Sequence, residues 1–172
     1  MDGTLDTIGQ KEDIARILFR DWVIDDRLQL NAFALRPGES YLSVNRLAVE
    51  SSFSDIHDFV NHHPDYMIPG ETGKCHLAVI RVRDIHDLSI SYMEWIASLT
   101  VEVEPRSAHY KSHAGIFTRV RGRNLKRGQQ LELLANNGQK VSYGEIELKV
   151  QLNLVRLAQL TTCELSLPQE QE

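Results

Sequence analysis

The sequence has little of what a disulfide-linked or membrane-embedded protein requires. It contains two cysteines, Cys75 and Cys163, in 172 residues, and their separation matches no metal-binding spacing. One disulfide between them stays open, but nothing demands an oxidising compartment. No run approaches the roughly 18 consecutive apolar residues of a membrane-spanning helix, and residues 1–6 lack the basic and apolar parts of a secretory signal. We therefore expect a cytoplasmic protein without membrane contact.

Repeats, low-complexity tracts and long linkers are also absent from the sequence. Hydrophobic residues make up 42% and charged residues 25% of the chain, an ordinary composition for a globular protein. The length suits one domain and is sufficient to bury a core without disulfides or structural metals. We predict a single globular domain over 1–172, with a frayed tail from about 165 to 172.

Acidic residues are missing from one stretch of an otherwise acidic chain. Residues 106–127 hold seven of the 19 Lys and Arg residues and none of the 24 Asp and Glu residues, although the net charge is −5. Neighbouring cations repel one another, and guanidinium groups suit phosphate because they donate two parallel hydrogen bonds. We call these seven cations the basic strip: Arg106, Lys111, Arg119, Arg121, Arg123, Lys126 and Arg127.

The basic strip favours a binding function. We predict a small cytosolic accessory protein, of a bacterial type, whose strip contacts a polyanion (nucleic acid or a nucleotide) or an acidic protein partner. The alternative is a solvated loop whose charges pair with the chain's own acidic side chains. The strip lacks the interleaved aromatic residues that stack on single-stranded bases.

Apolar spacing predicts an α+β fold. Ile14, Ile17, Leu18 and Trp22 recur at helical spacing and predict an amphipathic helix over 9–22. Hydroxyls before Asp55 predict a helix from about 51 to 62. Residues 84–98 are ambiguous between a helix and an irregular segment. Strands are predicted over 28–34, 41–46, 76–83, 99–104 and 114–120.

The C-terminal third carries two conflicting signals. The apolar residues of 146–154 alternate as in a strand, but Ser142 and Glu145 have the spacing of a helix capping box. Because the run is long and has no breaker, we predict a helix over about 143–161. The predicted fold is one small mixed or antiparallel sheet packed by N-terminal and C-terminal helices. Its predicted core includes Leu18, Trp22, Phe33, Leu42, Val79, Val101, Ile116 and Val150.

The predicted C-terminal helix has apolar residues outside its main stripe. Leu148, Leu152 and Val155 lie off the stripe that contains Ile146 and Val150. This second apolar face predicts a homo-oligomer or hetero-oligomer formed through the helix.

Two histidines near the start of the basic strip are candidates for acid–base chemistry. His109 and His113 are four residues apart, a spacing that suits a metal on a helix. Pro105 and Gly115 flank them and the segment offers no acidic or cysteine ligand, so we predict no metal and no cofactor. Imidazole titrates near neutrality, and adjacent cations favour its neutral, basic form. The alternative is that each histidine is a surface or structural residue.

Two short motifs begin with histidine. His76-Leu77-Ala78-Val79 and the segment 113–116 resemble the paired motifs of two-histidine phosphoesterases. The resemblance implies a histidine-dependent enzyme acting on phosphate esters. The family's hydroxyl residue, which holds the phosphate, is replaced by Ala78 in one motif and by Gly115 in the other.

A second resemblance follows the order of residues along the chain. Arg20, Ser43 and the Glu102-Val103-Glu104 element are similar in order to the arginine-type ADP-ribosyltransferases. The resemblance implies that Arg20 grips a nicotinamide dinucleotide, that Ser43 supports it and that Glu104 stabilises an oxocarbenium-like ribose. Asn45 stands where that family has a second serine, and the two glutamates also fit the polar face of a strand.

An enzyme is therefore the alternative to a binding protein. Its candidate catalytic residues are His109, His113, Ser43, Arg20 and Glu104. Such an enzyme requires His113, Ser43 and a carboxylate to converge on one cleft.

Overall fold

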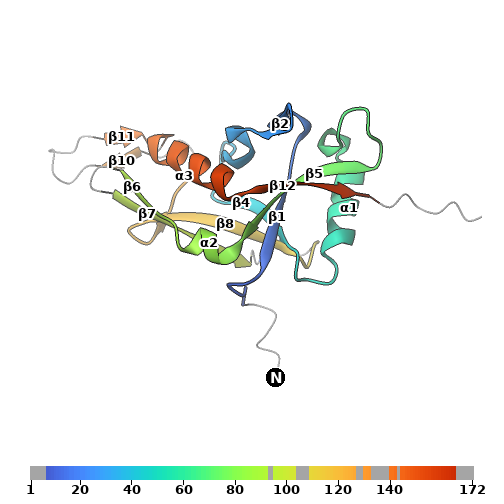
Figure 1. Cartoon of the computed structure of the whole chain (residues 1–172). Helices are drawn as coiled ribbons and strands as arrows, with labels where there is room; N and C mark the ends of the chain where they lie inside the picture. The colour runs from blue at the N-terminus through green and yellow to red at the C-terminus, as the bar shows by residue number, and fades with distance from the viewer. Residues whose placement is uncertain are drawn as a thin grey trace, which may run out of the picture.

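The structure, a computed structural model, describes residues 7–92, 95–103, 109–126, 130–132, 140–142 and 144–165. Its main element is a curled antiparallel β-sheet (Figure 1). Every strand in it pairs antiparallel with its neighbours. In spatial order the strands are β12 (Gln159–Glu164), β5 (Lys74–Arg81), β1 (Asp13–Ile17), β4 (Leu42–Arg46), β8 (His113–Val120), β7 (Trp95–Val103) and β6 (Ser89–Tyr92), with β9 (Arg123–Asn124) paired to the end of β8.

Short helices and two small hairpins complete the described parts. The hairpins are β2 (Val23–Ile24) with β3 (Arg27–Leu28), and β10 (Gln130–Glu132) with β11 (Lys140–Ser142). The α-helices are α1 (Ser52–His62), α2 (Val82–His86) and α3 (Gly144–Leu157), and the 3₁₀-helices are η1 (Arg20–Trp22), η2 (Leu30–Phe33) and η3 (Pro64–Tyr66). None of these helices is long and apolar enough to cross a membrane.

The alternating side chains of the strands bury the sheet on both faces. On one face the first core joins strand residues such as Val44 and Ile116 to Phe33 of η2 and Leu154 of α3. On the opposite face the second core lies under α1 and consists of Ala15, Ile56, Val60, Cys75, Leu77 and Leu165. Successive side chains of a strand point to opposite faces of the sheet. Neighbouring residues of one strand therefore contribute to different cores.

The predicted α+β fold is wrong, because the chain is mostly β. The predicted helix over 9–22 is instead β1 followed by η1. β1 lies in the middle of the sheet, and its three central residues are buried. A strand buried on both faces lacks strict alternation, so its apolar residues fall by chance at helical spacing. The predicted strand over 28–34 is mostly η2.

The C-terminal prediction was right at its start and wrong at its end. The helix α3 begins at Gly144 but ends at Leu157, and β12 follows along the edge of β5. The strand-like alternation over 146–154 falls entirely within α3, and β12 lies beyond it, so that signal was misleading. Leu165, the first residue of the predicted frayed tail, is buried and its amide donates to the Gly73 carbonyl at 2.6 Å. Residues 166–172 lie outside the described residues.

The other predicted elements are confirmed with small shifts. The strands over 41–46, 76–83, 99–104 and 114–120 correspond to β4, β5, β7 and β8, and the helix over 51–62 to α1. The ambiguous segment 84–98 contains most of α2, β6 and the start of β7. Of the predicted core, six residues are buried, whereas Trp22 and Val79 are half-buried.

The second apolar face of α3 is partly exposed. Leu148 and Leu152 are 47% and 43% exposed, whereas Val155 packs against the first core. Oligomerisation through α3 stays a prediction.

A glycine in β8 makes room for an aromatic ring. A Cβ added at Gly115 would lie 2.6 Å from the Tyr41 ring, and that ring packs on Phe117 with centroids 5.1 Å apart.

We expect Gly115→Ala to lower the free energy of unfolding by about 1–3 kcal/mol, because the Tyr41 ring has to move. Urea denaturation measures this loss. Gly9→Ala is the control, since its Cβ would meet Glu12 at an ordinary 3.6 Å; equal losses in both variants contradict the packing.

The two cysteines face each other across β5 and β12. Cys75 is fully buried and pairs in register with the half-buried Cys163, and both are free thiols. Burial, with a contribution from Cys163, raises the pKa of Cys75 to about 12.

We expect iodoacetamide at pH 8 to modify Cys163 before Cys75 in the folded protein, and both thiols equally in urea. Peptide mass spectrometry follows the two rates. Since the pKa of Cys75 is raised on folding, its neutral thiol stabilises the fold fully below about pH 9, and this contribution is lost as the pH rises toward 12. Faster modification of Cys75 in the folded state is the contrary result.

Candidate functional site

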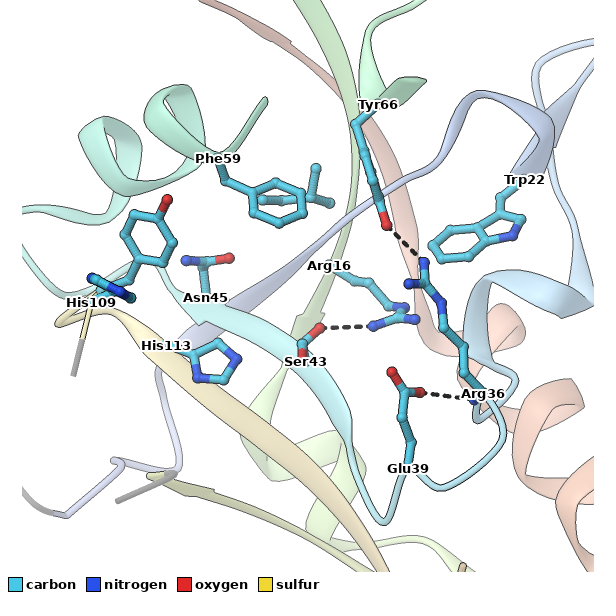
Figure 2. Close-up of a pocket in the computed structure, with 12 residues that line it drawn as sticks. Arg16, Trp22, Arg36, Glu39, Ser43, Asn45, Phe59, Tyr66, His109 and His113 are labelled. Carbon is cyan, nitrogen blue, oxygen red and sulfur yellow. Dashed lines mark hydrogen bonds between the residues drawn. The ribbon is translucent and has the colours of Figure 1, made fainter. Parts of the chain in front are cut away.

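A cavity of about 360 Å³ lies on the face of the sheet that carries α1 (Figure 2). Its floor is formed where β1, β4 and β8 run side by side. Ser43 pairs in register with Gly115, and Asn45 pairs with His113. Register and alternation therefore bring Ser43, Asn45 and His113 onto the same face.

The floor is held by a chain of hydrogen bonds to α1. Asn45 Nδ2 donates to Ser112 Oγ at 2.9 Å, and Ser112 Oγ donates to Asp55 Oδ2 at 2.6 Å. The Ser112 amide also donates to Asp55 Oδ2, at 3.1 Å. Beside it, the Tyr110 hydroxyl donates to Asp58 Oδ2 at 2.7 Å, a bond that raises the pKa of Tyr110 to about 12. These bonds fix the orientation of Asn45 and hold the segment before β8 against α1.

Arg16 fills the point where two neighbouring strands separate. β1 and β4 pair only at Ile14 with Arg46 and at Ala15 with Asn45. Beyond this point Arg16 Nη1 donates to the Ser43 carbonyl at 2.8 Å, and its Nε donates to the Ala32 carbonyl. The guanidinium thus donates to one carbonyl group of β4 and to one of η2.

The charge of Arg16 is buried. The residue is 7% exposed, and its guanidinium lies 5.1 Å from the centroid of the Trp22 ring. Burial lowers the pKa of Arg16 to about 10, while Glu39 opposes the shift, so Arg16 is protonated at neutral pH. No ion pair of Arg16 is found within the residues that the structure describes.

A second guanidinium lies at the edge of the same cavity. Arg36 Nη2 donates to the Tyr66 hydroxyl at 2.8 Å, and its Cζ lies 5.8 Å from the Trp22 centroid. The turn from Arg36 to Glu39 places it there: Gly38 has φ +82°, and the Arg36 amide donates to Glu39 Oε2 at 2.8 Å. Proline followed by a glycine with positive φ is typical of a type II turn. The turn sequence therefore fixes both an arginine and a carboxylate at the cavity.

Aromatic rings from three elements form the wall of the cavity. Trp22 ends η1, Phe59 comes from α1 and Tyr66 ends η3. Pro64 follows the end of α1, since proline cannot continue a helix, and the 3₁₀-turn turns Tyr66 back toward Phe59. The Phe59 and Tyr66 rings meet edge to face at 5.0 Å, and the Trp22 and Tyr66 rings do so at 6.2 Å.

The lining of the cavity is suited to an anion that carries a flat group. Arg16 and Arg36 give two positive charges, and Glu39 is the one carboxylate among the lining residues. Guanidinium groups bind phosphate and carboxylate through charge-assisted hydrogen bonds, while the aromatic wall offers ring faces and edges for stacking.

The sequence-predicted catalytic residues divide into three groups. His109, His113 and Ser43 line the cavity. Arg20 does not line it and forms an ion pair with Asp65 at 3.6 Å. Glu104 lies outside the described residues. Glu39, which was not predicted as a site residue, is the carboxylate that lines the cavity together with His113 and Ser43.

The two histidine motifs do not meet. β5 alternates so that His76 is on the face opposite Val79, whereas Val79, Ala15, Asn45 and His113 follow one another in register across the sheet. His76 and His113 therefore lie on opposite faces. A hydroxyl residue at position 115 would also meet the Tyr41 ring.

The basic strip is spread over both ends of β8. Lys111 precedes the strand, and Arg121 follows it, so the eight residues of β8 separate them by about 26 Å. Arg119 forms an ion pair with Glu102 and donates to Thr100 Oγ1 at 2.7 Å. Arg106 and Arg127 lie outside the described residues.

Three cations of the strip gather at the turn between β8 and β9. Arg121 has φ 51° and Gly122 has φ 73°, as a type I′ hairpin turn requires. The Arg121 guanidinium lies 4.2 Å from the Trp95 centroid. The side chains of Arg121, Arg123 and Lys126 are exposed.

Sequence reasoning missed the arginines and most of the aromatic wall of the cavity. Arg16 falls within an apolar segment that resembled an amphipathic helix, where a charge is expected on the solvent side. The Pro37-Gly38 turn was the available signal for Arg36 and Glu39. Trp22 was predicted as a core residue rather than as a cavity wall.

Among the described residues, no group of three or more His, Cys, Asp or Glu side chains is arranged to hold a metal ion. Comparison of the chain with models of protein families, with curated proteins and with solved structures finds no match.

Proposed function

We propose that the protein binds a small anionic ligand with a flat ring, of the nucleotide class, in the cavity between α1 and the sheet. The observation that carries this proposal is the pair of guanidinium groups, Arg16 and Arg36, beside the one Trp22 ring. Two cations held near each other repel, and an anion between them relieves that repulsion. Glu39 offsets only one of the two charges.

The rest of the lining supports a nucleotide over a simple anion. The volume of about 360 Å³ is in the range of small-molecule sites. The aromatic wall can stack on a base, and Ser43, Asn45 and His113 on the floor offer hydrogen bonds to a sugar. Inorganic phosphate alone would leave the aromatic wall without a partner.

Tryptophan fluorescence offers a direct test. Trp22 lines the cavity and Trp95 does not, so a Trp95→Phe variant leaves one reporter at the site. We expect adenosine 5′-monophosphate to change this fluorescence with at least tenfold higher affinity than adenosine, since a charge-assisted hydrogen bond is worth about 1.5–3 kcal/mol. The 5′-monophosphates of guanosine, uridine and cytidine extend the series.

Arg36→Met in the same background should bring the affinity for the monophosphates down to that for the nucleosides. Arg156→Met, at an exposed position of α3, is the matched control and should leave the affinity unchanged. Equal affinity for nucleosides and monophosphates, or no binding of any of them, contradicts the proposal.

A polyanion-binding role for the basic strip stays a second candidate. The exposed cations at the β8–β9 turn, Arg121, Arg123 and Lys126, support it. The ion pair with Glu102 partly neutralises the charge of Arg119. The convergence of His113, Ser43 and Glu39 on the cavity likewise supports turnover of a bound ligand, which stays a prediction.

For the strip, binding of a 20-base-pair DNA duplex should weaken with salt, with a log–log slope of about −0.9 for each phosphate contact. We expect the double variant Arg121→Ala/Arg123→Ala to flatten this slope by about two contacts, and Arg156→Ala to leave it unchanged. An unchanged slope in the double variant, or no duplex binding at low salt, rules out the strip as a nucleic-acid surface. Binding of polyglutamate without duplex binding indicates an acidic protein partner instead.

A further inference from the structure

A second cavity of about 430 Å³ adjoins the nucleotide site. Three residues, Arg36, Phe59 and Tyr66, line both cavities. They form a shared partition: Phe59 and Tyr66 are in edge-to-face contact, and Arg36 is hydrogen-bonded to the Tyr66 hydroxyl. A ligand group at Arg36 is therefore within reach of both cavities.

The second cavity continues the aromatic surface of the first. Phe19 lines the second cavity and not the first, and it meets the Tyr66 ring edge to face at 5.6 Å. His63 lies against Phe59 with ring centroids 4.5 Å apart and planes inclined at 36°. Flat rings thus line both sides of the partition, and a flat ligand group can stack on either side.

The charges of the two cavities differ. The nucleotide site has two guanidinium groups and one carboxylate. The second cavity is lined by one guanidinium, that of Arg36, and by one carboxylate, that of Asp65, which pairs with Arg20. The second cavity is therefore suited to an uncharged nucleoside, and a long polyanion would meet Asp65 there.

We propose that the two cavities together bind one dinucleotide, in which two nucleosides are joined through a pyrophosphate. The pyrophosphate lies at Arg36, where the cavities meet, with one base in the nucleotide site and the other between Phe19 and His63. Arg36 is suited to this position because a guanidinium has five N–H donors in a planar fork, one of which donates to Tyr66. The inference rests on the proposed nucleotide site and adds the second nucleoside to it.

The test compares adenosine 5′-monophosphate with diadenosine 5′,5′-pyrophosphate in calorimetric titrations of the whole protein. We expect the dinucleotide to bind about tenfold more tightly, which is the contribution of one more stacked base. His63→Ala removes a ring that lines the second cavity and not the nucleotide site, and it should remove this gain and leave the affinity for the monophosphate unchanged. Asn61→Ala, an exposed residue of α1 that lines neither cavity, is the matched control and should retain the gain.

The outcomes separate the two proposals. If the monophosphate binds but the dinucleotide binds no more tightly, the second cavity is not part of the site and the nucleotide site stands. If His63→Ala weakens both ligands equally, His63 supports the fold of the site and the dinucleotide proposal is wrong. If neither ligand binds, the nucleotide site itself is wrong and the dinucleotide proposal falls with it.

Discussion

A buried guanidinium at the centre of the sheet is the constraint on which the candidate site depends. β1 separates from β4 after two paired residues, and Arg16 occupies the opening and donates to the carbonyl groups of Ser43 and Ala32. Unsatisfied buried carbonyl groups are costly, so the side chain stabilises the separation of the two strands. That separation leaves room for the cavity, and it also fixes a positive charge at one side of it.

The cost of this arrangement links stability to binding. A buried charge is expensive unless hydrogen bonds and opposite charges compensate for it. Arg16 has two carbonyl groups, the Trp22 ring and the nearby Glu39, and Arg36 adds a second positive charge beside the same ring. An anion between the guanidinium groups supplies the missing compensation. The same contacts that hold the strands apart therefore favour the ligand class that we propose for the cavity.

Some strands and site residues could be predicted from the sequence and others could not, for physical reasons. β7 was predicted because apolar and polar residues alternate along it, and its apolar side lies in the first core. β1 was not, because its central residues are buried on both faces and its apolar residues fall at helical spacing, which makes Arg16 look like a surface residue. His113 and Ser43 were selected from sequence as chemically capable residues. Their neighbours Arg36, Tyr66 and Phe59 come from distant segments. The turn from Arg36 to Glu39 places Arg36, α1 carries Phe59, and the 3₁₀-helix after α1 places Tyr66.

The central claim, that a buried and protonated Arg16 forms part of an anion site, is tested most directly by nuclear magnetic resonance of the arginine Nε–H groups. Because the Arg16 Nε–H is buried and bonded to the Ala32 carbonyl, the account predicts a resonance that exchanges slowly with water. It also predicts that this resonance shifts on addition of adenosine 5′-monophosphate and stays unchanged with adenosine. A rapidly exchanging Arg16 signal, or one that the monophosphate leaves unmoved, would contradict the account.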